Sequence, residues 1–392
     1  MIQNKHVTEY IDQYRSGQIK LNKERIMLIE YLEKYILVRD DLYFNDELIE
    51  NYIRFTEKWY FPLNSFQKFA AAFVFLFHKE DDSVFYEQFF ITMARGGGKN
   101  GFISTLAHFF ISPLHGIPRY NISIVANSEL QAKTSFKEVY DVVESHDVLK
   151  EMFYNTKVEI KGNDTQSVLQ YHTSNASTKD GLRDGCVIYD EIHQYENSDT
   201  VNVFSSGLGK VPNAREFFIG TDGFVREGFL DKMKERAMNI LEGKDLEDPL
   251  FPFICKIDDP KEVDNPDMWE KANPMFSKPM SFYAKGLFKK VKAQYKQLAN
   301  NPSNREEFMT KRMNLPEVDL NKTVASWEDI LATNRPFPEL KHRIAVGGLD
   351  FASIKDFAAV GLLFKVGKDY VWKTHSFVRQ GFLDNVKLKV PI

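Results

Sequence analysis

A run of three glycines and a lysine, Gly96 to Lys99, stands between two apolar segments of the chain. The segment before it, QFFITM, is rich in the aromatic and β-branched residues typical of strands, and the segment from Phe102 to Phe110 favours a helix. A strand, a glycine-rich turn and a helix in that order present backbone N–H groups to an anion, because glycine lets the backbone come close. The run therefore predicts a phosphate-binding loop.

The loop departs from the usual phosphate-loop pattern at two positions. That pattern has Gly, four free positions and then Gly-Lys followed by Ser or Thr, whereas Met93 occupies the first position and Asn100 the last. Lys99 keeps the positive charge that reaches the outer phosphates, and Asn100 offers Mg²⁺ a carbonyl oxygen in place of a hydroxyl. For the loop alone, a solvent-exposed glycine turn is the alternative.

Two adjacent carboxylates are the second sign of a nucleotide site. Asp190 and Glu191 follow the apolar run CVIY, and a buried strand there would deliver both to the carboxyl edge of a parallel sheet, where ligands bind. Asp190 suits Mg²⁺, and Glu191 suits the orientation of a water molecule. Another apolar run, EFFIG, ends at Thr221, which is either a polar sensor beside the phosphates or a plain turn residue. Together the loop and the acids predict a nucleoside triphosphate site.

Between residues 85 and 222, short β-rich runs alternate with helical or polar stretches, which predicts an α/β fold with a mainly parallel central sheet. A chain of 392 residues has room for roughly two or three domains. Proline and acidic residues between 245 and 275 are typical of a linker. The predicted division is a helical N-terminal segment (1–60), a P-loop domain (61–245), a linker and helical subdomain (246–335) and a C-terminal domain (336–392).

Composition limits the class of protein. A hydrophobic content of 43% with 14% aromatic residues is enough for a core. No apolar run approaches the ~20 residues that span a bilayer, and the N-terminus lacks the apolar region of a signal peptide. Cys186 and Cys255 are too few for a disulfide framework or a zinc cluster. We therefore expect a soluble, cytoplasmic protein.

The order of these motifs resembles the large subunit of tailed-bacteriophage terminases, the ATP-driven motors that package viral DNA. The resemblance covers nearly the whole chain and includes the segments SIVANSELQAK, HTSNASTKDGLRD, WEKANP and FMTKRMNLPEVD, with Trp327 continuing the pattern. Members of that family often lack the first glycine of the loop, so Met93 agrees with the family. Asn100 still departs from the usual Ser or Thr.

The resemblance implies a role for each residue of the site. Glu191 would orient water, Arg95 would stabilise the transferring phosphoryl group in cis or on a neighbouring subunit, and Thr221 would couple hydrolysis to movement. Gln67 lies in a segment similar to the family's adenine-reading motif. Asp190 and Asn100 would hold the Mg²⁺ ion. The residues implied to bind ATP are Gln67, Gly96, Gly97, Gly98, Lys99 and Asn100.

The C-terminal segment HRIAVGGLDFASIKDFAAV predicts a β-hairpin whose first strand ends at Asp350. By resemblance this is the start of a ribonuclease-H-like nuclease, with Asp350 as its first Mg²⁺ or Mn²⁺ ligand, and two-metal cleavage needs several such carboxylates. Asp356 is expected to be a turn or support residue. Because few residues follow Asp350, we expect the nuclease domain to be incomplete and its activity lost; a small docking domain is the alternative.

The resemblance also implies the partners: double-stranded DNA, the small terminase subunit and the portal of the procapsid, with the chain forming a pentameric ring in the host cytoplasm. A motor grips DNA through its phosphates, without reading sequence. The net charge of −4 leaves room only for a local basic track. Candidates for it, unless they form an ordinary solvated helix face, are Lys285, Lys289, Lys290, Lys292 and Lys296.

Two other functions stay open. A helicase-like or repair ATPase would be stimulated by single-stranded DNA. A scaffold that binds DNA or portal with a degenerate nucleotide site would show no ATP turnover and would be unchanged by Lys99→Ala. The pair Asp190 and Glu191 argues against the scaffold, because a dead site has no need for both acids.

Overall fold

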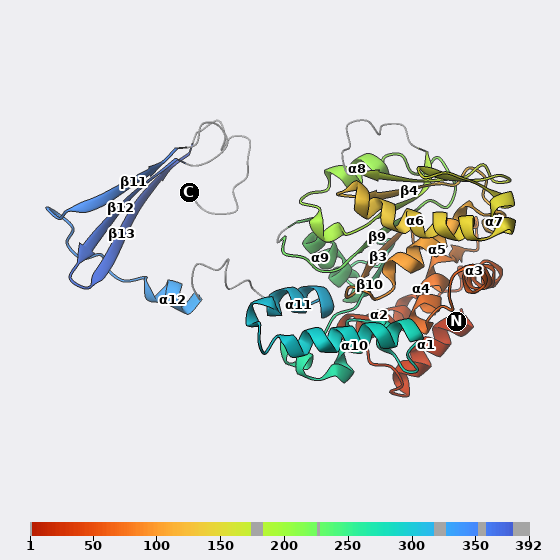
Figure 1. Ribbon diagram of the computed structural model, residues 1–392, viewed down its shortest axis with the longest axis horizontal. Helices are drawn as coiled ribbons and strands as arrows, with labels where there is room; N and C mark the ends of the chain where they lie inside the picture. Colours follow the sequence, from red (N-terminus) through yellow and green to blue (C-terminus); the bar gives the residue numbers. More distant parts are fainter. Residues whose placement is uncertain (1, 174–182, 226–227, 317–326, 352–357, 379–392) are drawn as a thin grey trace. The chain divides into compact units, whose positions relative to one another are not determined.

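The chain forms two compact units, Met1–Val318 and Asp319–Ile392, in the computed structural model (Figure 1). The residues that the structure describes are 2–173, 183–225, 228–316, 327–351 and 358–378. Among the helices of these ranges, none has both the length and the apolar character needed to cross a bilayer.

The larger unit is built on a mainly parallel sheet, as the alternation of the sequence predicts. Its strands, in the order β10-β3-β9-β8-β4-β7-β6-β5, are parallel from β10 to β7 and antiparallel beyond. They span β3 (Gln88–Thr92), β4 (Asn121–Ala126), β5 (Phe153–Asn155), β6 (Glu159–Gly162), β7 (Val168–Thr173), β8 (Asp184–Tyr189), β9 (Arg215–Gly220) and β10 (Leu250–Ile254). Parallel neighbours end at the same edge, so the segments after β3, β8 and β9 meet there.

Helices cover this sheet, so its central strands are buried. Every residue of β8 and β9 is buried, which is typical of parallel strands covered on both faces. Helices α5 (Lys99–Ile111) and α6 (Glu129–Ser145) contact β4 and β7, and α9 (Phe229–Leu241) contacts β10. Two short helices, α7 (Asp147–Met152) and α8 (Asp199–Ser205), complete this part of the unit.

Residues 2–78 form a largely helical N-terminal segment that shares the core of the sheet. Side chains such as Tyr10, Leu28 and Phe69 belong to the same buried cluster as β3 and β9. The segment also contains a small antiparallel pair of strands that the sequence did not indicate. Its elements are α1 (Lys5–Arg15), α2 (Lys23–Tyr31), a π-helical turn (Leu32–Ile36), β1 (Leu42–Phe44), α3 (Asp46–Trp59), α4 (Ser65–Val74) and β2 (Leu76–His78).

The proline-rich stretch between residues 245 and 275 contains a strand of the central sheet, which its linker-like composition did not predict. Strand β10 pairs in parallel with β3, directly beside the strand that leads into the glycine loop. Its run LFPFI is short and includes Pro252, which cannot donate a ladder hydrogen bond. That proline is tolerated because β10 lies at the edge of the sheet.

Residues after β10 form a subdomain with a core of its own. The connecting segment 255–281, here called the strap, leads into α10 (Phe282–Gln297) and α11 (Arg305–Arg312). Trp269 is fully buried at the centre of this second core, which also contains Phe276, Phe308 and Met309. The same cluster includes Ala94 of the glycine loop, so the subdomain packs directly against that loop.

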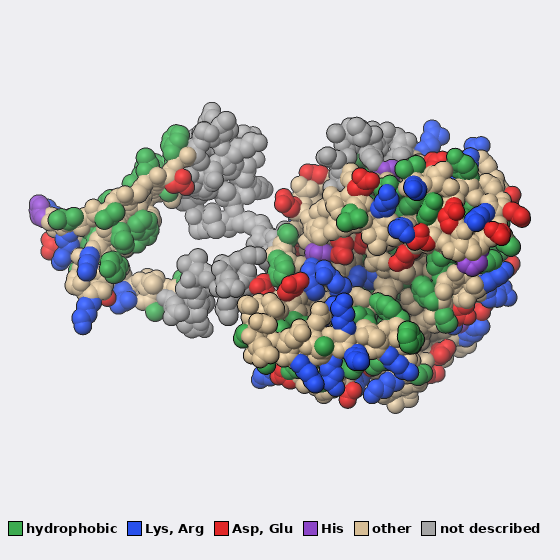
Figure 2. All heavy atoms as spheres, in the orientation of Figure 1, with side chains coloured by type: hydrophobic (Ala, Val, Ile, Leu, Met, Phe, Trp, Pro, Cys, Tyr) green, Lys and Arg blue, Asp and Glu red, His purple; other side chains and the backbone are tan. Residues whose placement is uncertain are grey.

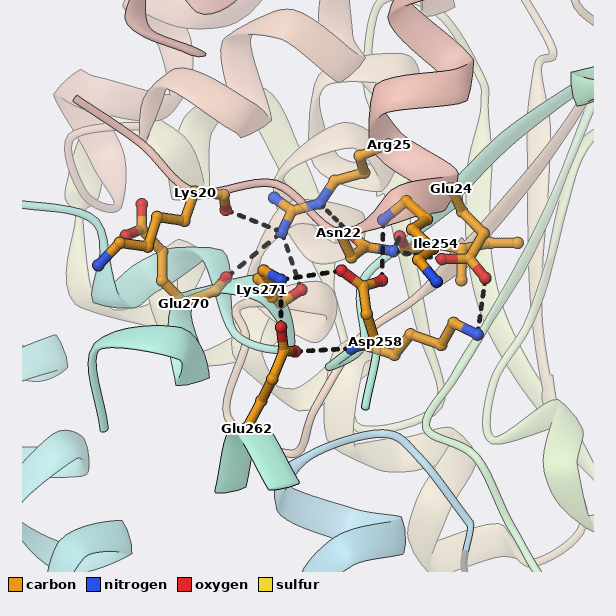
Figure 3. A network of polar contacts seen from close by, with 11 residues as sticks. Lys20, Asn22, Glu24, Arg25, Ile254, Asp258, Glu262, Glu270 and Lys271 are labelled. Atoms are coloured by element: carbon orange, nitrogen blue, oxygen red, sulfur yellow. Dashed lines mark hydrogen bonds and ion pairs between the residues drawn. The ribbon is translucent and has the colours of Figure 1, made fainter. Parts of the chain in front are cut away.

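Arg25 of α2 fastens the strap to the N-terminal segment (Figure 3). Its guanidinium is fully buried and donates to Asn22 Oδ1 at 2.7 Å and to the carbonyl oxygens of Lys271 at 2.8 Å and Glu270 at 3.3 Å. Lys271 Nζ, in turn, contacts Asp258 Oδ2 at 2.9 Å. Because buried carbonyls need donors, Arg25 stabilises the strap where it meets the N-terminal segment.

The smaller unit contains α12 (Trp327–Ala332) and an antiparallel sheet of β11 (Ala345–Asp350), β12 (Ala358–Val366) and β13 (Asp369–Phe377). The predicted strand ending at Asp350 is confirmed, and the hairpin is extended by a third strand. The β12–β13 turn includes Gly367, whose φ of +64° favours glycine. Trp372 packs over Gly361, where a Cβ atom would come within 2.2 Å of its ring.

Candidate functional site

The glycine loop between β3 and α5 has the backbone that its sequence predicts. Gly96 and Gly98 both have a φ of +87°, and Gly98 is the N-cap of α5. A Cβ atom on Gly97 would lie 2.7 Å from Met93 Sδ, so the close curl of the loop requires glycine there as well. The positive end of the α5 dipole and the first N–H groups of the helix therefore meet at this loop, as an anion site requires.

Lys99 lies inside the curl of the loop. Its ammonium is buried and donates to the carbonyl oxygens of Met93 at 2.7 Å and Ala94 at 3.4 Å. Burial lowers the pKa of Lys99 to about 8, although the charges of Glu191 and Asp190 oppose the shift. A cation thus stands at the point where the loop meets the acidic pair.

Asp190 and Asn100 lie together, as predicted. Asn100 Nδ2 donates to Asp190 Oδ2 at 3.0 Å and to Ser135 Oγ at 3.1 Å. Asp190 is buried, and burial, reinforced by the charge of Glu191, raises its pKa to about 7. A buried carboxylate of this kind is stabilised by a cation, and the metal role of Asp190 and Asn100 stays a prediction.

Glu191 has a strained backbone and an ionised side chain. Its φ of 52° and ψ of 45° are left-handed, which costs a non-glycine residue about 1–2 kcal/mol. Burial raises the pKa of Glu191, but the contact with His193 and the charge of Lys99 outweigh it and hold the pKa at about 2. His193 Nδ1 lies 3.1 Å from Glu191 Oε2, although the angles fall short of a hydrogen bond. The contact with His193 and the charge of Lys99 therefore keep the Glu191 side chain ionised.

Thr221 follows the last residue of β9 and lies in the same site. It is accompanied there by Lys311, which the sequence did not indicate as a site residue. The ammonium of Lys311, from α11, lies 3.4 Å from Thr221 Oγ1 and 2.9 Å from His193 Nε2. A cation next to Thr221 was not expected from a residue 90 positions further along the chain. In the sequence, Lys311 was marked only by its place in the segment FMTKRMN. His193 was marked only by its place beside the acidic pair.

The strap and α10 contact the outer side of the loop. The N–H of Ala94 donates to the carbonyl of Ala272 at 3.0 Å, and the hydroxyl of Tyr283 donates to the carbonyl of Gly96 at 3.2 Å. A Cβ atom on Gly96 would meet Leu287 Cδ2 at 2.6 Å, so the loop and α10 fit closely. The predicted linker region thus forms part of the site.

Arg95 is exposed and lines a cationic cavity of about 200 Å³. Its backbone N–H donates to the carbonyl of Lys311 at 2.8 Å, and its carbonyl accepts from Arg312 Nη1 at 3.0 Å. Burial, together with the neighbouring charge of Arg95, lowers the pKa of Arg312. Lys311 and Arg312 line the cavity with Arg95, and Glu307 supplies a negative charge.

Gln67 is buried close to the loop and caps α4. Its Oε1 accepts from the N–H of Asn64 at 2.9 Å, which completes a capping box, and its Nε2 lies 3.5 Å from the carbonyl of Gly98. The structure therefore gives Gln67 a role in the fold, and the adenine contact that the resemblance implies stays a prediction.

Asp350, the predicted nuclease ligand, ends β11 and is exposed. Asp356 lies outside the described residues. Within the ranges that the structure describes, no three His, Cys, Asp or Glu side chains are grouped as a metal site would need. The metal role of Asp350 stays a prediction.

Comparison with known proteins identifies two consecutive domains. Residues 65–239 match the terminase large subunit ATPase domain, and residues 244–389 match the terminase large subunit endonuclease domain. The chain belongs to the terminase large subunit family. The resemblance inferred from the motifs is confirmed, and the α/β fold expected from it is confirmed as well.

Two curated relatives of this chain are terminase large subunits of phages. The terminase large subunits of Lactococcus phages p2 and SK1 are each 21% identical over 373 residues, which cover 93% of this chain and 66% of theirs. The chain thus spans about two thirds of the length of these curated relatives. The HK97 bacteriophage large terminase has a similar fold, with a TM-score of 0.58 and 19% identity over 84% of this chain and 67% of that one.

Proposed function

We propose that this chain hydrolyses ATP and uses the free energy to move double-stranded viral DNA into procapsids, as the large subunit of a terminase. The observation that carries the proposal is the convergence of the glycine loop, Asp190, Glu191 and Thr221 at the carboxyl ends of adjacent parallel strands. Both the family and the loop geometry support the ATPase activity. DNA as substrate follows from the family alone.

The residues fit a magnesium nucleotide. The N-terminus of α5 and the buried ammonium of Lys99 suit a phosphate, and Asp190 with Asn100 suits Mg²⁺. When bound, Mg²⁺ neutralises charge on the phosphate oxygens. The protein's own residues do the rest: Gly96 to Lys99 hold the phosphates and Glu191 orients the attacking water.

Arg95 and Thr221 complete the proposed centre. The exposed side chain of Arg95 stabilises charge on the transferring phosphoryl group, either in its own subunit or in the next subunit of a pentameric ring on the portal. Thr221 couples the state of the centre to movement. The small terminase subunit is a further proposed partner, and Asp350 is the proposed first Mg²⁺ or Mn²⁺ ligand of the nuclease domain.

Phosphate release from ATP tests the proposal. The chain is expected to hydrolyse ATP with Mg²⁺, and double-stranded DNA is expected to stimulate it more than single-stranded DNA. A preference for single strands would favour a helicase-like enzyme instead. Absence of turnover under all these conditions, with unchanged behaviour of Lys99→Ala, would favour a scaffold.

Asn100 is expected to set the magnesium requirement. Asn100→Ala removes both the Nδ2 donor to Asp190 Oδ2 and the carbonyl oxygen proposed as a Mg²⁺ ligand, so the Mg²⁺ concentration for half-maximal hydrolysis should rise about tenfold. Asn100→Ser restores an oxygen and should stay nearer to the wild type. ATPase titrations with Mg²⁺ measure both. Identical profiles for the three proteins would show that position 100 does not contact the metal.

Helix α10 is the proposed DNA-contacting surface. Figure 2 shows Lys and Arg side chains gathered over the region of α10, at the lower edge of the larger unit. Phe282–Gln297 contains five lysines and no acidic residue, and all five lysines are exposed. Ala284 and Val291 are buried on the other side of the helix. A dense positive surface of this kind binds phosphates without regard to base sequence.

Replacing the five lysines of α10 with alanine should weaken double-stranded DNA binding by at least about tenfold at low salt and flatten its salt dependence. Basal ATP turnover without DNA should change little. The matched control replaces exposed lysines elsewhere on the unit, each of which contacts a carboxylate: Lys5, Lys137, Lys150 and Lys244. Equal losses in both variants, measured by fluorescence anisotropy, would contradict the assignment of α10.

A further inference from the structure

Lys311 joins three segments of the proposed ATPase centre, although it comes from the endonuclease-matched part of the chain. Its carbonyl accepts from the N–H of Arg95 in the glycine loop at 2.8 Å. Its ammonium donates to the carbonyl of Asp222, after β9, at 3.1 Å and contacts Thr221 Oγ1 at 3.4 Å. The same ammonium lies 2.9 Å from Nε2 of His193, after β8.

The contact between Lys311 and His193 fixes the orientation of the imidazole. An ammonium has no acceptor, so Nε2 of His193 accepts and the ring proton lies on Nδ1. Nδ1 lies 3.1 Å from Glu191 Oε2, within the distance of an ion pair although not aligned as a hydrogen bond. Lys311 thus presents the proton-bearing side of the ring to the carboxylate that orients water.

Packing supports this arrangement. A Cβ atom on Gly223 would lie 2.7 Å from His193 Cδ2, so the tip of β9 presses closely against the ring. Glu191 itself has left-handed backbone dihedrals, which persist only where the surroundings enforce them. The tip of β9 thus holds the His193 ring, which lies beside the Glu191 carboxylate.

We propose that Lys311 is a positioning residue of the ATPase centre: through His193 it holds the Glu191 carboxylate in the orientation needed to align water, while its backbone ties that alignment to Arg95. This inference rests on the proposed ATPase function. It also connects the centre to α10, because Arg312, the next residue, donates to Gln294 Oε1 at 3.0 Å. A displacement of α10 would therefore reach Glu191 through α11.

Lys311→Met tests the proposal, because it keeps the unbranched stem of the side chain and removes the ammonium. The ATP turnover number should fall at least about tenfold, since small misplacements of a catalytic group are costly. The affinity for ADP, measured with a fluorescent analogue, should change less than about threefold. Among the described residues, the one N–H of the glycine loop that Lys311 contacts is that of Arg95, and it does so through the Lys311 carbonyl, which the substitution keeps. Lys278→Met, at an exposed position of the strap, is the control and should behave as the wild type.

A double-mutant cycle with His193→Gln distinguishes positioning from a general loss of structure. If Lys311 acts through His193, the double variant should be no slower than the more impaired single variant. Additive losses, or loss of ADP binding in Lys311→Met, would overturn the proposal. Unchanged turnover in Lys311→Met would overturn the positioning role of Lys311 but not the proposed ATPase function. A wild type that does not hydrolyse ATP would overturn both.

Discussion

Glu191→Gln is expected to abolish most ATP turnover while leaving nucleotide binding intact. The substitution keeps the size of the side chain but removes the charge that the folded protein maintains, since the pKa of Glu191 is held at about 2. A neutral amide orients water poorly and accepts no proton, so turnover should fall at least about 100-fold. Phosphate release measures the turnover, and a fluorescent ADP analogue measures the binding.

Glu196→Gln is the matched control for this substitution. Glu196 lies five positions further along the same segment and is exposed, so the same chemical change should leave turnover close to that of the wild type. Turnover at the wild-type rate in Glu191→Gln would exclude the role assigned to Glu191. Loss of ADP binding in that variant would show instead that Glu191 supports the fold of the loop.

Arg25→Leu is expected to lower the free energy of unfolding more than any other substitution proposed above. It would leave the carbonyl of Lys271 and the Oδ1 of Asn22 buried without their donor. Each unsatisfied buried group costs roughly 1–3 kcal/mol, so we expect a loss of about 3 kcal/mol. For a unit of this size the thermal midpoint should fall by at least about 5 °C, which scanning fluorimetry can measure.

Arg15→Leu provides the control for Arg25→Leu. Arg15 makes two contacts with Glu33, at 2.6 and 2.7 Å, but its side chain is 58% exposed. Exposed pairs contribute only about 0.2–1 kcal/mol, so the midpoint should move by no more than about 2 °C. Similar shifts in both variants would contradict the view that Arg25 fastens the strap.

Local patterns in the sequence were enough to predict most of the centre. Gly96 and Gly98 have the positive φ that only glycine adopts without strain, and β8 carries Asp190 to the sheet edge because its apolar run is buried on both faces. These properties depend on residues adjacent in the chain. The meeting of Asp190 with Asn100 then follows from the parallel pairing of the strands.

Contacts between segments that are distant in the chain could not be predicted from local sequence patterns. Strand β10 has an acidic and proline-rich setting, and only its pairing with β3 shows that it belongs to the sheet. His193 has no special local pattern, because its role depends on the closeness of Glu191 and Lys311. Tyr283 and Leu287, which contact the outer side of the glycine loop, lie in the helical part of the region 246–335 that was predicted to be separate from the P-loop domain.

The sequence by itself determined the strand–loop–helix of the phosphate site, the acidic pair and the family, because each rests on short-range spacing and on the order of motifs. Only the tertiary structure decided that the strap, α10 and α11 pack on the glycine loop, and that Lys311 enters the centre. Hydrophobic burial around Trp269 brings these residues together, and burial joins segments without regard to their separation along the chain.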